Sequence, residues 1–318
     1  MLSRVADSLF WMSRYLERAE HTARVINIQL NLMLERGSKS DDLDWARVLR
    51  SLGVELPSED VAGAQVLAQS LLHDASNQHS IVASIKFARE NARQVREQIS
   101  SEMWEQLNRL FHAVRRRGGS QEAWDARDFL QSIKEGAHLF QGITDSTMTH
   151  GEGWQFIQAG RFLERTMSLS TLVGAHFHEF HQTGQPSAER AYLESIGLLR
   201  SCTAFEAYCK AYTADVKPQR IAEFLVLHPS FPHSLRFSAE ALETAIKDIG
   251  REAGSRRSAR VERMAGRLRA TLDFAHIDEI MGGNLEGYLD EIRRQCAQVH
   301  GALYQTYISY PIEAALEA

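Results

Sequence analysis

Two short segments of the chain carry arginine and glutamate in the same order and spacing. Arg14-Tyr15-Leu16-Glu17-Arg18 recurs as Arg161-Phe162-Leu163-Glu164-Arg165. Arginine grips carboxylates and phosphates through paired hydrogen bonds, so two copies brought together could form an anion-binding site. The candidate substrate-binding residues are therefore Arg14, Arg18, Arg161 and Arg165.

The surroundings of the second copy predict that its charges are buried. Residues 154–173 carry only three charged side chains, and apolar residues occupy most of the helical wheel, which is typical of a buried helix. Buried ions must be paired. We expect each motif's first arginine to pair with the glutamate three positions later on the same helix, leaving Arg18 and Arg165 as second cations.

The candidate catalytic residues are Glu17 and Glu164, either of which could act as a general base beside arginines that stabilise negative charge. A neighbouring arginine lowers the pKa of a glutamate and makes it a weaker base, which favours binding over proton transfer. An ion-pair network that only locks the fold together, or a solvated charged face, is the alternative.

Two further matches follow the first in the same order, which indicates an internal duplication. Leu49-Arg50-Ser51 recurs as Leu199-Arg200-Ser201, and His79-Ser80-Ile81 recurs as His233-Ser234-Leu235. The serines suit helix N-caps. The histidines have no equally clear structural reason, so His79 and His233 join the candidate substrate-binding residues. We predict two similar halves, 1–145 and 146–318, packed as one domain.

The hydrophobic pattern predicts an all-α fold, a pseudo-symmetric bundle of the two halves. Only 6 prolines and 20 glycines interrupt the 318 residues, and no stretch alternates as a strand would. Loops are expected around Pro218 and over 228–234. The predicted helices span 3–35, 43–52, 59–73, 78–117 (one or two helices), 121–141, 154–181, 187–213, 234–249, 256–275 and 284–309.

Composition excludes several classes of function. The net charge of −5 gives no general basic field, so nucleic-acid binding is not expected. The three cysteines cannot form a disulfide framework. Charged residues interrupt the amino-terminal apolar stretch, and no apolar run reaches the ~20 residues of a membrane span. We therefore expect a cytoplasmic protein without a membrane segment. No nucleotide or serine-hydrolase motif occurs, and no cofactor is predicted.

Three other patterns are better explained by structure than by chemistry. His176, His178 and His181 lack the i, i+4 spacing of helical zinc sites, and no metal site is predicted. The arginine-rich stretch 251–269 is interpreted mainly as a solvated helix face, with binding of an acidic partner, RNA or phosphates as the alternative. Cys202 and Cys209 lie too far apart on one helix to bond and fit a role as core residues.

The two Glu-Arg segments, in an all-helical chain of this length, resemble the bacterial alpha-E domain family, which is named for such motifs. Further stretches that look like it are 145–149 with 151–154, 199–208 and 222–227. Members of the family are encoded beside, or fused to, circularly permuted ATP-grasp proteins and transglutaminase-like proteins. The resemblance thus implies ATP-grasp-type and transglutaminase-like partners and an amide-bond-forming pathway.

Two functions remain open at this point. The chain could bind an anionic substrate at the Glu-Arg cluster within such a pathway, with or without catalysis, so the sequence does not decide whether it is an enzyme. It could instead be a non-enzymatic helical scaffold whose network is structural. Access of solvent to Glu164 and Arg165 separates the two: a cavity reaching them supports the first, and closed packing supports the second.

Overall fold

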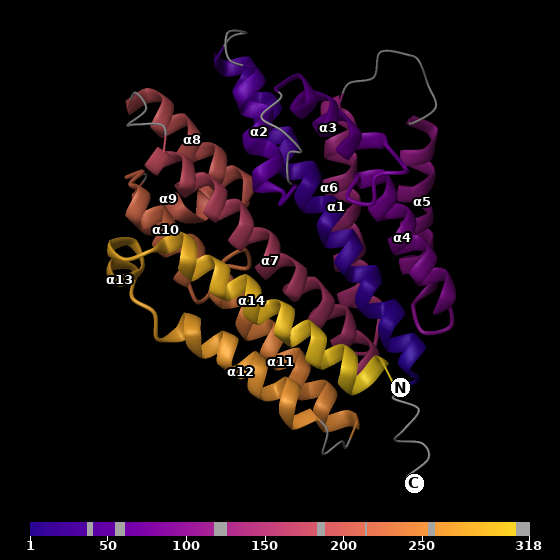
Figure 1. The fold of residues 1–318 in the computed structure, drawn as a ribbon. Helices are drawn as coiled ribbons and strands as arrows, with labels where there is room; N and C mark the ends of the chain where they lie inside the picture. Colours follow the sequence, from indigo (N-terminus) through magenta and orange to yellow (C-terminus); the bar gives the residue numbers. More distant parts are fainter. Residues whose placement is uncertain are drawn as a thin grey trace.

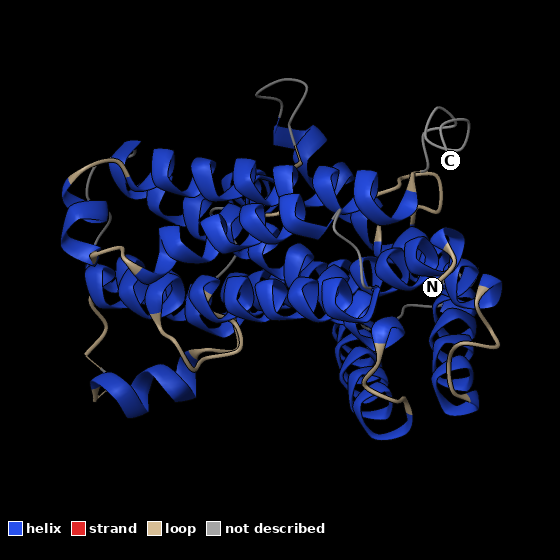
Figure 2. Cartoon of the chain, turned by 90° about the horizontal axis from the view of Figure 1, so that it is seen from below, coloured by secondary structure: helices blue, strands red, loops and turns tan. Residues whose placement is uncertain are grey.

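The computed structural model describes residues 1–36, 41–54, 61–117, 126–182, 188–213, 215–253 and 258–309. Within these ranges the chain is helical and contains no strand, which confirms the predicted all-α class (Figure 2). In chain order the elements are α1 (Ser3–Arg36), α2 (Asp41–Ser51), α3 (Val61–His73), α4 (Ile81–Gln94), α5 (Ser101–Arg117), α6 (Ala126–Thr147), α7 (Glu152–Gln182), α8 (Ala188–Ser201), α9 (Phe205–Tyr212), α10 (Pro218–Leu227), α11 (Leu235–Ala253), α12 (Ala259–Asp273), α13 (Ile277–Gly282), α14 (Leu285–Leu303) and a π-helical turn η2 (Tyr304–Ile308).

Two long helices form the centre of the bundle. α1 packs against α4, α6 and α7, and α7 packs against α1, α11 and α14. Figure 1 shows α4, α5 and α6 on the far side of α1, with α11, α12 and α14 beside α7. The helices that contain the two Glu-Arg motifs are therefore covered by neighbours on several sides.

Burial of α7 agrees with its apolar composition. Every residue from Gln155 to Gly160 is buried, and Leu163 to Thr166 are buried as well. Because α7 has few polar side chains around its surface, other helices must cover most of that surface. The prediction of a buried helix around the second motif is confirmed.

The first repeated tripeptide forms the end of α2. The Val54 N–H donates to the Leu49 carbonyl at 2.9 Å, and the Gly53 N–H donates to Arg50 at 3.0 Å. Gly53 has φ +70°. This pair of bonds, with a left-handed residue just past the helix, is a Schellman ending.

The second tripeptide ends α8 in the same way. The Ala204 N–H donates to the Leu199 carbonyl at 2.7 Å, and Thr203 donates to Arg200 at 3.1 Å. Thr203 takes the left-handed conformation at φ 53°, which is costly for a β-branched residue. The helix predicted over 187–213 is consequently wrong at this point, because this turn separates α8 from α9.

The third repeated segment begins a helix in both places. Ser80 Oγ accepts from the Ala83 N–H at 3.0 Å, and Ser234 Oγ accepts from the Phe237 N–H at 3.1 Å. Both serines are N-caps, as predicted. All three sequence matches thus occupy similar local structures, while the division into halves 1–145 and 146–318 stays a prediction.

Several predicted boundaries differ from the structure. α6 continues through Gly142 to Thr147, since one glycine costs a helix only ~1 kcal/mol relative to alanine. α10 was expected to be loop, yet Pro218 is tolerated at its first position, where no N–H is needed. The short helix α13 was also missed. Within the described ranges, no helix combines the length and apolar composition that crossing a membrane requires.

Candidate functional site

A close crossing of α1 and α7 brings the two motifs together. A Cβ added to Gly160 would lie 2.3 Å from the Phe10 carbonyl oxygen and 2.3 Å from Ser13 Oγ. Only glycine permits this approach of the two backbones. Gly160 directly precedes Arg161, and Ser13 directly precedes Arg14, so the crossing fixes where the charged side chains meet.

Glu164 is held by both arginines of the other copy. Arg18 Nε donates to Glu164 Oε1 at 2.6 Å, and Arg14 Nε donates to Glu164 Oε2 at 2.7 Å. Arg14 and Glu164 are buried, whereas the Arg18 side chain keeps 24% exposure. The second cation of the first motif is therefore the one that reaches the surface of the cluster.

Glu17 has the reciprocal partners. Arg165 donates to its two oxygens, Nε to Oε1 at 2.6 Å and Nη2 to Oε2 at 3.0 Å. Gln141 Nε2 donates to Oε2 at 3.3 Å, and Arg161 Nε lies 3.9 Å from the same oxygen. Arg165 is only 3% exposed.

The expected pairing of arginine and glutamate within one helix is wrong. Each glutamate instead binds arginines of the other helix. An i, i+3 pair on one helix is geometrically possible, but the facing sides of the two crossing helices bring each glutamate closer to the arginines of the other motif. The four arginines and two glutamates do form one cluster.

The aromatic position of each motif supports its second arginine, a role that the sequence analysis missed. The guanidinium of Arg18 lies 5.6 Å from the Tyr15 ring centre, and that of Arg165 lies 5.4 Å from the Phe162 ring centre. Arg14 lies 4.5 Å above Trp11. The i, i+3 spacing of aromatic and arginine was the available signal for these cation–π contacts.

Burial and charge act in opposite directions on these groups. Burial acts to raise the pKa of Glu164, but the charges of Arg14 and Arg18 outweigh it, and the pKa lies below the usual value. Burial acts to lower the pKa of Arg18, yet Glu164 holds it above the usual value. Arg161 has its pKa lowered to about 10, by burial first and by Arg165 second. Glu164 is thus a weak base.

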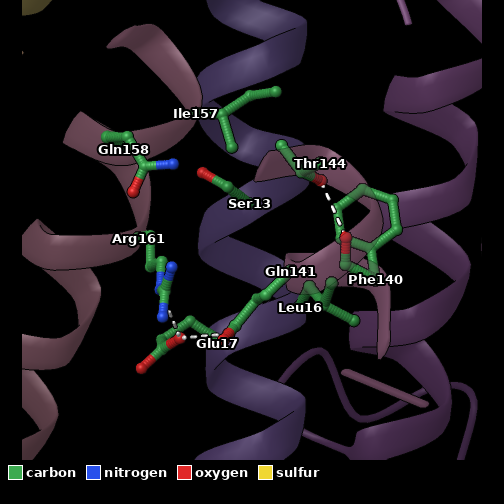
Figure 3. Close-up of a pocket in the computed structure, with 9 residues that line it drawn as sticks. All are labelled: Ser13, Leu16, Glu17, Phe140, Gln141, Thr144, Ile157, Gln158 and Arg161. Carbon is green, nitrogen blue, oxygen red and sulfur yellow. Dashed lines mark hydrogen bonds and ion pairs between the residues drawn. The ribbon is translucent and has the colours of Figure 1, made fainter. Parts of the chain in front are cut away.

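A small cavity lies between the helices on the Glu17 side. Figure 3 shows Arg161 and Gln141 pointing toward Glu17, with Ser13, Gln158 and Thr144 around the space. The cavity measures about 20 Å³, which is enough for one water molecule and too small for an organic ligand. Arg161 Nε has no hydrogen-bond partner among the described residues.

A larger cavity opens on the opposite side of the cluster, at what we call the Arg18 end (Arg18, His21, His79, Glu164, Met167 and Thr171). It measures about 250 Å³, and the end of α2 forms part of its lining. His21 lines it, and the buried Nε2 of His21 has no hydrogen-bond partner in the described structure. Burial lowers the pKa of His21, so this ring is neutral at pH 7.

His79 and His21 stand differently toward this cavity. His79 is exposed and lines its edge, just before the N-cap of α4. His21 was not among the predicted site residues. Its position three residues after Arg18 on the motif helix was the signal that could have identified it.

The other end of the cluster is filled by a second ion pair, and we call it the Arg165 end (Arg165, Glu17, Glu20, Arg24, His138 and His233). Arg24 pairs with Glu20 on the same helix. His138 Nε2 lies 3.6 Å from Glu20 and 3.2 Å from Arg24. Arg165 Nη1 donates to the Pro232 carbonyl at 3.2 Å.

The titrating groups of the Arg165 end are strongly shifted. Burial lowers the pKa of His233 well below its ordinary value, and the charge of Arg165 adds to this effect. Burial acts to raise the pKa of Glu20, but hydrogen bonding to His138 and the charge of Arg24 hold it well below the usual range. His233 is therefore neutral and half-buried, unlike the exposed His79.

The remaining sequence candidates lie apart from one another. His176 is buried with its pKa lowered to about 3 by burial, and His178 Nδ1 lies 3.2 Å from Glu286. The side chain of His181 lies outside the described residues. Cys202 is buried and Cys209 is half-buried, and neither is bonded. No group of three metal-binding side chains occurs in the described part of the chain.

The arginine-rich stretch is in part a network of surface pairs. Arg269 binds Glu243 at 3.0 Å and Asp273 at 3.0 Å, and Arg260 donates to Gln305 at 2.9 Å. Arg263 and Arg267 are exposed. Arg256 and Arg257 lie outside the described residues.

The crossed Glu-Arg pairs between two long buried helices define the class: an all-helical domain built around a duplicated Glu-Arg motif. The chain belongs to the Alpha-E family, described as a predicted alpha-helical domain with a conserved ER motif, and matches it over residues 1–308. This confirms the resemblance seen in the sequence.

Similar proteins occur in mycobacteria. Uncharacterised proteins from Mycobacterium bovis and Mycobacterium tuberculosis are each 25% identical to this chain over 321 residues. The match covers 94% of this chain, which spans only 35% of the length of each relative. No solved structure matches the chain.

Proposed function

We propose that the protein binds a small substrate carrying a carboxylate or phosphate in the cavity at the Arg18 end. The observation that carries this proposal is the cavity of about 250 Å³, which reaches both Arg18 and Glu164. Arg18 uses Nε to hold Glu164, and its two terminal amino groups donate to no described residue. A guanidinium whose outer nitrogens face a cavity can take an anion through two hydrogen bonds.

The surrounding groups suit such a ligand. His21 Nε2 and the hydroxyls of Ser168 and Thr171 lie along the same cavity. The paired Glu164 neutralises Arg14 and orients Arg18, which makes it a positioning residue. The lowered pKa of Glu164 disfavours the catalytic alternative in which this glutamate, or Glu17, takes a proton.

The pathway follows from the family and not from the geometry. We place the protein in an ATP-grasp-associated pathway that forms peptide or amide bonds, with ATP-grasp-type and transglutaminase-like proteins as partners. About two thirds of each mycobacterial relative lies outside the match, so in those proteins the domain is joined to further sequence. In this proposal the domain supplies the bound acid, and a partner activates it.

The second candidate is a scaffold without a ligand, with a purely structural network. The Arg165 end favours it, because Arg165 is 3% exposed and both of its ion-pair contacts go to Glu17. On this view the cavity at the Arg18 end would be incidental.

Binding of small acids to the purified protein separates the two. Isothermal titration with glutamate, an acidic dipeptide and inorganic phosphate should give binding that Arg18→Gln weakens at least tenfold. Arg18→Lys keeps the positive charge and loses the paired N–H donors of the guanidinium, so it should weaken binding less than Arg18→Gln does. Arg263→Gln, on the exposed face of α12, removes the same charge elsewhere and should change nothing. Absence of binding to the wild-type protein would favour the scaffold.

A further inference from the structure

The cavity at the Arg18 end continues along α7 as a groove. A second cavity of about 200 Å³ shares Thr171 with it and is also lined by Arg50, Ala175 and Arg293. A third cavity, of about 290 Å³, shares Gly174, His178 and Glu286 with the second. The shared wall residues place the three cavities next to one another, in a row from the Glu-Arg cluster to the start of α14.

One face of α7 forms the floor of this groove. Glu164, Ser168, Thr171, Ala175 and His178 follow one another at intervals of three or four residues, which places them on the same side of the helix. Fourteen residues of helix separate the first from the last, a distance of roughly 21 Å at ~1.5 Å per residue. An extended peptide covers that length with about six residues.

The middle of the groove carries two small residues, although Arg293 and Leu289 of α14 pack closely over the first of them. Position 174 is glycine, and a Cβ added there would lie 3.5 Å from Arg293 Nη1, in ordinary contact. Ala175 is half-buried and presents only a methyl group. A larger side chain at position 175 would occupy the path without touching the Glu-Arg cluster.

The lining suits a peptide better than a uniform polyanion. Arg18, Arg50 and Arg293 place cations along the path, but Glu286 and His178 stand at its far end, 3.2 Å apart. Apolar walls accompany them at Phe177, Met281 and Leu285. A chain of phosphates gains nothing from apolar walls and is repelled by Glu286, whereas a peptide can pack apolar side chains on the walls and donate a backbone N–H to this carboxylate.

We infer that the groove along α7 binds an extended acidic peptide of about six residues, with one carboxylate at Arg18 and the remainder lying over Thr171, Ala175 and His178. This inference rests on the proposed function, because it starts from the anion site at Arg18. It adds the length and the class of the substrate.

Two peptides that differ only in length test it. Calorimetry would compare acetyl-Ala-Glu with acetyl-Ala-Glu-Ala-Glu-Ala-Glu, both with free carboxyl termini, on the full-length chain at one salt concentration. The hexapeptide should bind the wild type at least tenfold more tightly than the dipeptide. Ala175→Leu should remove that advantage and leave dipeptide binding unchanged.

A matched pair of arginines gives an independent variant. Arg50→Gln should weaken the hexapeptide several-fold and leave the dipeptide unaffected. Arg200 occupies the same place in the second Leu-Arg-Ser segment and is exposed over Phe205, so Arg200→Gln should change neither. The Arg50 and Arg200 variants therefore test binding of the hexapeptide in the groove even if Ala175→Leu disturbs folding.

The outcomes distinguish the two proposals. If the dipeptide binds at Arg18 and the hexapeptide binds no more tightly, the groove is wrong and the anion site stands. If neither peptide binds the wild type, the proposed function fails and the groove with it. If linear inorganic polyphosphate displaces the hexapeptide and binds more tightly, the site is one for polyanions and the peptide class is wrong.

Discussion

The two ends of the Glu-Arg cluster use the same motif and differ in what stands beside it. At the Arg18 end, Met167 and Thr171 of α7 line a cavity of about 250 Å³. At the same offset on α1, the Arg165 end has Glu20 and Arg24, which pair with each other. Arg18, which faces Met167 and Thr171, is thus accessible, whereas Arg165, which faces the paired Glu20 and Arg24, is enclosed.

The two copies of the motif share their ion pairing and differ in solvent exposure. Arg165 is 3% exposed and is bound by both oxygens of Glu17, while Arg18 keeps 24% exposure and a single bond to Glu164. In the proposed function, the enclosed end contributes stability and the open end binds the ligand.

Removing each end's arginine should have the largest effect and should separate these roles. Arg165→Gln leaves buried Glu17 without its close partner, because Arg161 is 3.9 Å away, and a broken buried pair costs ~3–5 kcal/mol. Arg18→Gln leaves Glu164 bound to Arg14 at 2.7 Å and should cost about 1 kcal/mol, in line with a partly exposed pair. Urea unfolding measures both. Equal losses would show that the two ends are energetically alike.

The crossing point shared by both ends gives the next largest effect. Gly160→Ala places a Cβ 2.3 Å from the Phe10 carbonyl oxygen, so α1 and α7 must separate, at a cost of ~1–3 kcal/mol. Gly142→Ala is the control, because a Cβ there meets nothing within 4 Å. It should be neutral or stabilise α6 by up to about 1 kcal/mol. Thermal unfolding of the two variants would contradict this if Gly160→Ala were as stable as Gly142→Ala.

Exchanging the flanking residues should convert one end into the other. Met167→Glu with Thr171→Arg reproduces the Glu20–Arg24 pair at the Arg18 end and should fill the cavity, weakening ligand binding at least tenfold, or ~1.4 kcal/mol. Titration with the acidic dipeptide measures this.

A control with side chains close in size to the natural ones tests why the cavity closes. It distinguishes the charge and length of the introduced glutamate and arginine from the mere replacement of Met167 and Thr171. Met167→Leu with Thr171→Val leaves the space nearly unchanged and should retain binding. Loss of binding in this control would mean that the two positions contact the ligand directly.

The last effect concerns the dependence of stability on pH and belongs to the Arg165 end. The pKa of His233 is lowered well below 6.5 by burial, so below pH 6.5 the unfolded chain takes up a proton that the folded chain resists. The contribution of the neutral His233 ring to the free energy of unfolding is complete above pH 6.5. It declines as pH falls, by up to ~1.4 kcal/mol per pH unit. His233→Asn should flatten the fall in unfolding free energy between pH 6.5 and 5. His79→Asn serves as the exposed control, and an unchanged slope in both variants would exclude His233.

The sequence predicted the class of fold, the buried second motif helix and the meeting of the two motifs, because apolar periodicity and repetition are local signals. It did not predict which arginine binds which glutamate, since that depends on the crossing of α1 and α7 at Gly160. It also missed α10, which begins at Pro218, and the break between α8 and α9 at Thr203. A proline and a β-branched residue occupy these two positions, and tertiary packing decides the structure there. His21 was overlooked although its position three residues after Arg18 was a signal, because the sequence does not show the cavity beside the ring.

The crossed pairing has a consequence for how the chain is made. Arg14 and Glu164 are separated by 150 positions, and Arg165 and Glu17 by 148. While the ribosome is still building α7, the charges of α1 have no close counterions from the other motif, and burying them would be costly. The amino-terminal helices therefore cannot settle into their final packing until α7 has left the exit tunnel. The core around α1 can therefore close only after the middle of the sequence has been made, and the interval before closure is the time when the chain is most exposed to chaperones and proteases.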